Sequence, residues 1–151
     1  MKRYSLLLGA TALALAPAAA MAERGSSGHL NIIYWQAPST LNPYLSGGTK
    51  EVESASLILE SLARFDDTGT MVPWLAESIP TVENGGVSED LTSITWTIAE
   101  GVTWSDGSAL TPADFVFTWE YCTHPEGGCA QASYFDGVTS VEAVDDRTVR
   151  I

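Results

Sequence analysis

The chain has 151 residues, a formal net charge of −12 and 45% hydrophobic residues. This acidic balance excludes a nucleic-acid-binding face, which requires clustered Lys and Arg, and it makes an anionic membrane surface an equally poor partner. The hydrophobic content suffices for one modest core and excludes a disordered chain.

The first 22 residues have the pattern of a secretory signal peptide. Lys2 and Arg3 form a basic start, residues 6–20 are almost wholly apolar, and residues 20–22 place Ala at the two positions that a signal peptidase reads. A membrane anchor is the alternative, but the apolar run is shorter than the roughly 20 residues that span a bilayer. No Cys lies near the cleavage point. We therefore expect a periplasmic protein that is neither lipid-anchored nor embedded in the membrane.

Residues 29–35 predict the first strand of the mature chain. Apolar side chains occupy both faces of the alternation, which is typical of a strand buried on two sides in an α/β sheet. Trp35 ends this strand just before a loop broken by Pro38 and Pro43. Because ligands gather beyond the carboxyl ends of strands in such sheets, Trp35 is a candidate pocket residue, with a structural position as the alternative.

A helix is expected from Lys50 to about Leu62, with Thr49 as its cap. The apolar residues that recur at helical spacing form its expected buried stripe: Val52, Ala55, Leu59 and Leu62. Residues 63–65 and 71–75 follow as extended segments on either side of a turn, and Pro73 indicates a sheet edge.

The alternation over residues 92–98 predicts the clearest strand of the chain, and residues 102–104 are expected to return beside it as its partner. Residues 138–144 and 148–151 predict two further strands. The sequence stops inside the last of these strands, so we expect a truncated chain.

A second helix is predicted to start at Thr111. Thr111 provides a capping side chain, Pro112 suits the first helical position, and Asp114 completes a capping-box pair. The apolar residues that follow give the helix a buried face, and the helix is expected to end near Tyr121 or Cys122.

The only two cysteines, Cys122 and Cys129, flank a segment rich in turn-forming residues. In an exported protein a disulfide is the default interpretation of such a pair. The alternative is a metal site with His124 as a third ligand, but zinc sites prefer cysteines that are closer in sequence. We expect a disulfide and no metal.

No catalytic set stands out in the sequence. There is no G-x-S-x-G motif, and the two histidines, His29 and His124, fall at a strand start and in a turn. The adjacent acids at 66–67, 89–90 and 145–146 lack the spacing of a calcium loop. We expect neither an enzyme nor a bound cofactor.

Five segments carry, by their order, a resemblance to a known family. They are residues 40–43 (TLNP), 59–66 (LESLARFD), 72–78 (VPWLAES), 96–107 (WTIAEGVTWSDG) and 110–119 (LTPADFVFTW). The chain resembles the family 5 extracellular solute-binding proteins, which serve importers of dipeptides, oligopeptides, nickel and some oligosaccharides. Asn42 departs from the family pattern, which usually has Asp at this position.

The resemblance implies an α/β fold of the periplasmic-binding-protein-like (type II) class with two lobes, of which only the N-terminal portion is encoded. Residues 1–22 would be the signal peptide, residues 23–49 the opening strand and loop of the large lobe, and residues 50–151 a small accessory α/β domain. The chain would bind a peptide or similar solute and deliver it to the permease subunits of an ABC transporter.

The same resemblance implies which residues contact the solute. Peptide-binding members use the loop after the Leu-Asp-Pro segment and a tyrosine after the second helix. The matching residues are Ser46, Gly47, Gly48, Thr49 and Tyr134. The rival hypothesis is a small secreted carbohydrate-binding module, suggested by the five Trp residues. Trp96 and Trp119 fall on core faces, which favours the solute-binding protein.

Overall fold

The computed structural model describes residues 28–151, so the predicted signal peptide at residues 1–22 lies outside the described residues. The chain divides into two units, residues 1–33 and residues 34–151. The described part of the first unit, residues 28–33, contains no helix or strand, and the side chain of Ile33 is 97% exposed.

The strand predicted over residues 29–35 is therefore wrong. Its apolar side chains are exposed, with Leu30 at 82% and Trp35 at 70%, where burial on both faces was expected. A strand is stabilised by backbone hydrogen bonds to a neighbouring strand, and among the described strands none pairs with this segment. The apolar alternation thus has no sheet here to be buried against.

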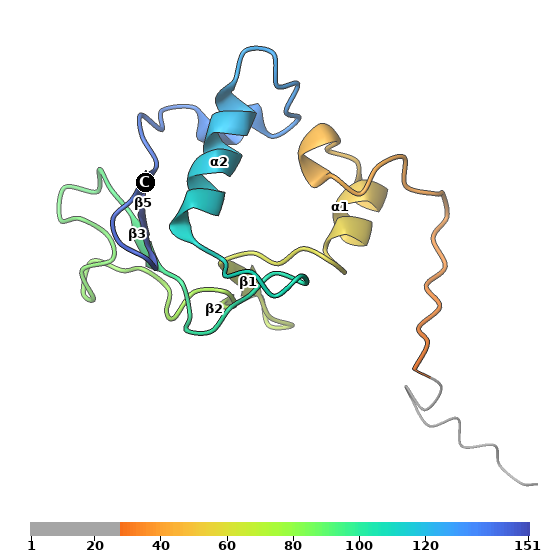
Figure 1. Ribbon diagram of the computed structural model, residues 1–151, viewed down its shortest axis with the longest axis horizontal. Coiled ribbons are helices and arrows are strands. Elements are labelled where there is room, and N and C mark those ends of the chain that lie inside the picture. Colours follow the sequence, from red (N-terminus) through yellow and green to blue (C-terminus); the bar gives the residue numbers. More distant parts are fainter. Residues whose placement is uncertain (1–27) are drawn as a thin grey trace, which may run out of the picture. The chain divides into compact units, whose positions relative to one another are not determined.

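The second unit contains all the described helices and strands (Figure 1). In chain order they are the 3₁₀ turn η1 (Pro43–Leu45), α1 (Thr49–Ala55), β1 (Ala63–Phe65), β2 (Met71–Pro73), β3 (Thr95–Thr97), α2 (Pro112–Thr123), the 3₁₀ turn η2 (Ala132–Phe135), β4 (Glu142–Ala143) and β5 (Thr148–Arg150).

Two small antiparallel sheets form the β structure. In the first, β1 pairs with β2 around a turn in which the Asp66 carboxylate accepts hydrogen bonds from the N–H groups of Thr68 and Thr70. In the second, the strand order is β3–β5–β4, so β5 is central. Trp96 lies opposite Val149, and Ala143 lies opposite Val149 on the other side. The extended segment expected at 63–65 is confirmed, and the one expected at 71–75 is a strand only as far as Pro73.

The pairing predicted for the clearest strand is wrong. β3 pairs with β5 and not with residues 102–104. The segment after β3 folds back on itself instead: the Trp104 N–H donates to the carbonyl of Ser108 at 2.8 Å, and the Asp106 carboxylate accepts from the Ser108 N–H at 2.9 Å. This tight local turn occupies backbone groups that residues 102–104 would need in order to pair with β3. The strand predicted at 138–144 shrinks to Glu142–Ala143.

Helix α2 begins where the sequence predicts. The Asp114 carboxylate accepts hydrogen bonds from the Thr111 N–H at 2.8 Å and from its hydroxyl at 3.1 Å, as part of a capping box. Such a box stabilises the start of the helix because it occupies free donors at the terminus. The helix ends at Thr123, within two residues of the prediction, and packs on β4 and β5.

Helix α1 is shorter than predicted. It ends at Ala55 instead of Leu62, and its N-cap is Gly48 instead of Thr49. Of the predicted buried stripe only Ala55 is buried, while Val52 and Leu59 are exposed. Short helices depend on packing of one face for their stability. With little of its apolar face covered, α1 continues only as turns, in which the hydroxyl of Ser56 donates to the carbonyl of Glu53.

The core of the second unit lies around β5 and α2. Its buried apolar side chains are Ala55, Ala76, Ile98, Cys122, Val141 and Val149. Arg147 ties the end of β3 to this core, since its Nε and one terminal nitrogen donate to the carbonyl oxygen of Ile98 at 2.9 and 2.7 Å. The same guanidinium pairs with Glu77 and Glu100.

Candidate functional site

The candidate site consists of the loop at residues 46–49 and the turn η2, which carries Tyr134. Long-range hydrogen bonds join the residues that precede these two segments. The N–H of Ala130 donates to the carbonyl of Tyr44 at 2.7 Å, and the Gln131 side-chain amide donates to the carbonyl of Pro43 at 3.0 Å. The ligand residues predicted from opposite ends of the chain thus follow two segments that are bonded to each other.

The turn before the loop is fixed by its own side chains. The Asn42 side-chain oxygen accepts from the N–H of Tyr44 at 2.9 Å, which caps η1. The Thr40 hydroxyl in turn accepts from the N–H of Asn42 at 3.1 Å. Asn42 therefore provides the cap that Asp also provides, so the departure from the family pattern leaves this turn intact.

Behind the loop lies the buried carboxylate of Glu51. Glu51 is only 2% exposed; its carboxylate accepts from the N–H of Ser39 at 2.9 Å and pairs with Lys50 at 3.0 Å. These partners, the Ser39 N–H foremost, lower the pKa of Glu51 to about 2. A Cβ at Gly48 would overlap this carboxylate, so a larger residue at this position would require the Glu51 side chain to shift.

The backbone of the loop is extended. Ser46 has φ −152° and ψ 133°, and Gly48 has φ −71° and ψ 138°. The N–H of Gly48 is occupied by the hydroxyl of Ser46 at 3.2 Å. Among the described residues, no hydrogen bond uses the N–H or the carbonyl of Gly47, which is exposed. Gly47 therefore presents free backbone groups on an extended segment.

Aromatic side chains connect the turn before the loop to helix α2. The ring of Tyr44 meets the ring of Tyr121 edge-on with centroids 6.4 Å apart, and Tyr121 stacks on Phe117 at the same distance. Burial raises the pKa of Tyr44. Phe117 is exposed, and Tyr134 on η2 is 80% exposed. These last two rings leave apolar surface available beside the bonded segments.

Trp35, the predicted pocket residue, is 70% exposed. Its ring lies 5.8 Å from that of Tyr34, its neighbour in sequence. Among the described residues, no hydrogen bond or aromatic contact joins Trp35 to the loop at 46–49. Its place in a pocket stays a prediction.

The two cysteines lie beside the site. Cys122 ends the buried face of α2, and its Cα atom lies 4.9 Å from that of Cys129, with the sulfur atoms at disulfide distance. Cys129 directly precedes Ala130 and Gln131, which bond to the turn before the loop. The pair therefore links helix α2 to the site.

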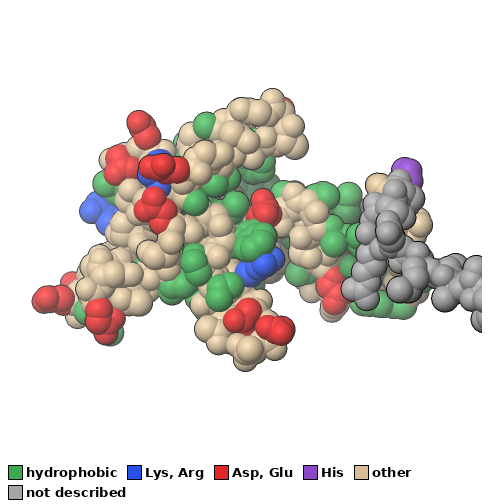
Figure 2. Space-filling view, turned by 90° about the horizontal axis from the view of Figure 1, so that it is seen from below, with side chains coloured by type: hydrophobic (Ala, Val, Ile, Leu, Met, Phe, Trp, Pro, Cys, Tyr) green, Lys and Arg blue, Asp and Glu red, His purple; other side chains and the backbone are tan. Residues whose placement is uncertain are grey.

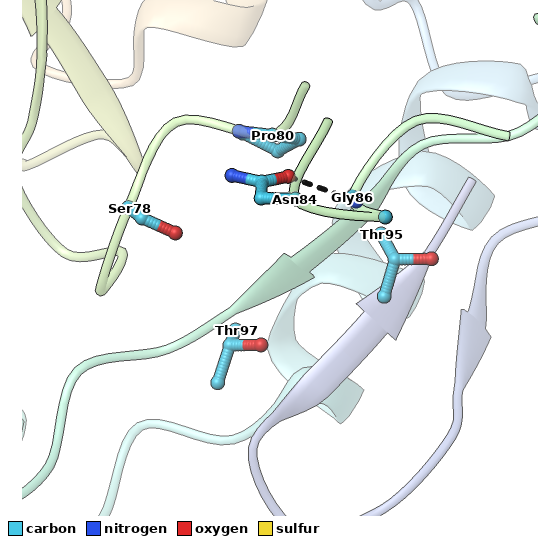
Figure 3. Close-up of a pocket in the computed structure, with 7 residues that line it drawn as sticks. Ser78, Pro80, Asn84, Gly86, Thr95 and Thr97 are labelled. Carbon is cyan, nitrogen blue, oxygen red and sulfur yellow. Dashed lines mark hydrogen bonds between the residues drawn. The ribbon is translucent and has the colours of Figure 1, made fainter. Parts of the chain in front are cut away.

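A separate hollow of about 210 Å³ lies along β3, where no binding residue was predicted from the sequence. Figure 3 shows Thr95 and Thr97 of β3 opposite Ser78 and the turn that holds Asn84. The Asn84 side-chain oxygen accepts from the N–H of Gly86 at 2.9 Å, and its amide donates to Ile79. The turn is therefore built from satisfied groups, and none of the predicted ligand residues lines the hollow.

The surface of the described residues carries scattered acidic side chains with apolar side chains exposed between them (Figure 2). Within residues 28–151, no cluster of three or more His, Cys, Asp or Glu side chains is arranged to hold a metal ion. In the same range, no helix has both the length and the apolar character needed to cross a bilayer.

Comparison with known proteins gives a consistent result. The model of the family "bacterial extracellular solute-binding proteins, family 5 Middle" matches residues 70–151. The periplasmic oligopeptide-binding protein OppA of Haemophilus influenzae is 29% identical over 149 residues, which is 95% of this chain and 26% of that protein. This chain thus spans about a quarter of the length of that relative.

Solved structures show the same similarity. The crystal structure of H. influenzae OppA with the peptide RPPGFSPFR superposes with a TM-score of 0.64 at 29% identity, over 76% of this chain and 24% of that one. The binding protein AgaA of A. tumefaciens R10, in complex with agropinic acid, gives a TM-score of 0.65 at 26% identity, over 75% and 22%. The expected fold class, a portion of the type II periplasmic-binding-protein fold, is confirmed.

Proposed function

Since this chain belongs to the family 5 bacterial extracellular solute-binding proteins, we propose that it is part of a periplasmic peptide-binding protein of an ABC importer. The protein binds its solute between two lobes and presents the closed form to the permease subunits in the membrane. Residues 23–49 belong to the large lobe and residues 50–151 to a small accessory domain. Export follows from the signal peptide at residues 1–22, without a lipid anchor.

One observation carries the assignment of the site: Ala130 and Gln131, which precede Tyr134, donate hydrogen bonds to the carbonyls of Tyr44 and Pro43, which precede the loop at 46–49. This proximity supports one surface with free backbone groups at Gly47 and an exposed ring at Tyr134. A solute that contacts one segment is therefore in reach of the other. The site is a binding surface and not a catalytic one, which agrees with the family.

A peptide fits this surface better than the other solutes of the family. An extended peptide pairs its backbone with free N–H and carbonyl groups of an extended segment, and Gly47 provides both groups. An exposed aromatic ring such as Tyr134 suits an apolar side chain of the peptide. The structure of H. influenzae OppA contains a peptide of nine residues, which supports this choice.

The rival carbohydrate-binding module receives less support. A sugar platform requires exposed Trp faces, and the exposed Trp35 and Trp104 lie far apart in the sequence. One face of the Trp74 ring is covered by the guanidinium of Arg64 at 3.2 Å. The Trp74 ring nitrogen is also bonded to Glu60 at 2.7 Å. Trp96 and Trp119 are partly buried in the β3 and α2 layers.

Calorimetric titration tests the proposal. The complete gene product that carries this chain is titrated with RPPGFSPFR, with trialanine and with agropinic acid, which is the solute of the AgaA structure. We expect saturable binding of at least one peptide at micromolar strength or tighter, and none of agropinic acid. Binding of agropinic acid alone would contradict the peptide assignment, and the absence of any binding would contradict the site.

A further inference from the structure

We propose that the Cys122–Cys129 disulfide is a positioning device for the ligand site: it holds residues 129–131 against the turn at 43–45 and thereby sets the affinity for peptide. The inference rests on the proposed peptide-binding function. It adds a role for two residues that do not touch the solute themselves.

The first step is the anchoring of Cys129 to helix α2. Cys122 is buried in the last turn of α2, and the intervening residues form a compact turn. In that turn the N–H of Gly127 donates to the carbonyl of His124 at 2.9 Å, and the N–H of Glu126 donates to His124 Nδ1 at 3.1 Å. The disulfide thus closes a short loop whose far end, Cys129, is fixed to a buried position.

The second step leads from Cys129 to the loop at 46–49. The next two residues, Ala130 and Gln131, donate to the carbonyls of Tyr44 and Pro43 at 2.7 and 3.0 Å. The ring of Tyr44 packs edge-on against Tyr121, which is also on α2. The turn before the loop is therefore held by its backbone through the disulfide-linked segment and by its ring on α2.

The third step leads from Cys129 to Tyr134. The carbonyl of Cys129 accepts from the N–H of Ala132 at 3.3 Å, and the carbonyl of Gln131 accepts from the N–H of Tyr134 at 3.0 Å. Turn η2 therefore begins directly after the disulfide-linked segment. The Cys122–Cys129 bond thus anchors the residues from which η2 starts and which bond to the turn before the loop.

Loss of the bond should weaken binding more than it disturbs the fold. Of the buried core residues, only Cys122 belongs to the disulfide, and Val149 is held in the sheet opposite Trp96. The site segments would have to be ordered again on binding, which weakens the affinity. The expected increase in the dissociation constant is about tenfold.

The decisive experiment compares the complete gene product with its Cys122→Ser/Cys129→Ser variant. Calorimetry with RPPGFSPFR measures the dissociation constant, and hydrogen–deuterium exchange of the ligand-free proteins measures protection at residues 43–49. Glu126→Ala, an exposed change inside the cysteine loop, is the matched control. In a parallel arm dithiothreitol reduces the wild-type bond, giving two protein thiols and the cyclic disulfide of the reductant.

We expect an affinity about tenfold lower in the serine variant and in the reduced protein, faster exchange at residues 43–49, and unchanged exchange at residues 95–97 of β3. The control should behave as wild type. A folded serine variant with wild-type affinity and wild-type exchange at 43–49 would overturn the inference.

A second variant keeps the test decisive if the serine variant fails to fold. Gln131→Leu leaves the cysteines in place and removes only the bond to Pro43; it should weaken peptide binding and speed exchange at 43–49, and wild-type behaviour would overturn the inference. If wild type itself binds no peptide, the proposed function fails, while the exchange at residues 43–49 still decides whether the disulfide holds the turn.

Discussion

Residues 95–151 and residues 34–59 are stabilised in different ways. The first region has a central strand, a capped helix and a buried apolar core. The second has one short helix and is held by polar contacts, such as the hydrogen bonds from Lys50 to the Ala37 carbonyl at 2.9 Å and from Ser39 to Glu51. Its large side chains Leu57 and Ile58 remain exposed.

The two regions therefore have different roles in this chain. The region with its own core forms a scaffold. The region without one carries the loop at 46–49, which is attached to the scaffold at residues 130 and 131. Elements of low local stability commonly carry binding segments. Four substitutions test whether the two regions are stabilised in these different ways.

The largest effect is expected from the core. Ile98 is 1% exposed, and Ile98→Ala should lower the free energy of unfolding by about 2–5 kcal/mol through lost packing and a cavity. Ile58→Ala in the other region removes the same atoms from a side chain that is 63% exposed, and should cost less than about 0.5 kcal/mol. Denaturant unfolding measures both; similar losses would mean that residues 34–59 have a core of their own.

The next effect concerns the arginine at the end of the sheet. Arg147→Ala leaves the carbonyl of buried Ile98 without its two guanidinium donors and should cost about 1.5 kcal/mol. Arg150→Ala is the matched control, because its half-exposed pair with Glu142 should contribute at most about 1 kcal/mol. Equal losses in denaturant unfolding would contradict the role given to Arg147.

The helix cap ranks third. Asp114→Ala removes the acceptor for the Thr111 N–H and hydroxyl, and should cost about 1 kcal/mol. Glu120→Ala, at an exposed position of the same helix, should be close to neutral. Thermal unfolding followed by circular dichroism separates the two variants, and an unaffected Asp114→Ala protein would show that α2 needs no cap.

The fourth effect lies in the polar region and depends on pH. The pKa of Glu51 falls from 4.5 to about 2 on folding, chiefly because of the Ser39 N–H. Since a lowered carboxylate pKa favours the folded state only above its unfolded value, this contribution is complete above pH 4.5 and is lost as the pH falls toward 2.

Glu51→Gln should therefore reduce the acid sensitivity of stability within that window, whereas Glu53→Gln, exposed on the same helix, should not. Urea unfolding at a series of pH values between neutral and acid measures the difference. A wild-type pH profile in the Glu51→Gln protein would show that the Glu51 carboxylate does not contribute to stability in this way.

The sequence predicted several features whose partners are close in the chain. The capping box at Thr111 and Asp114, the β1–β2 turn and the proximity of Cys122 and Cys129 follow from a few neighbouring residues, and the structure agrees. The strand at 29–35 failed because its apolar pattern specifies burial but not the partner that provides it.

Long-range pairing could not be predicted from local patterns. Residues 102–104 have the strand pattern of a neighbour for β3, but Asp106 and Ser108 close a local turn, and β5 takes the place beside β3. The contact between the turn at 43–45 and residues 130–131 depends on backbone groups and one amide. Such groups carry no sequence signal, so the loop at 46–49 and Tyr134 were predicted from the family resemblance alone.

The loop at 46–49 and Tyr134 are proposed to form one solute-binding surface. The most direct test is hydrogen–deuterium exchange of the complete gene product with and without RPPGFSPFR at saturation. We expect slower exchange at both residues 46–49 and residues 132–135 when peptide is bound, with no change at residues 78–86 beside the hollow along β3. Protection confined to residues 78–86 and 95–97 would contradict this binding surface and place the solute in the hollow instead.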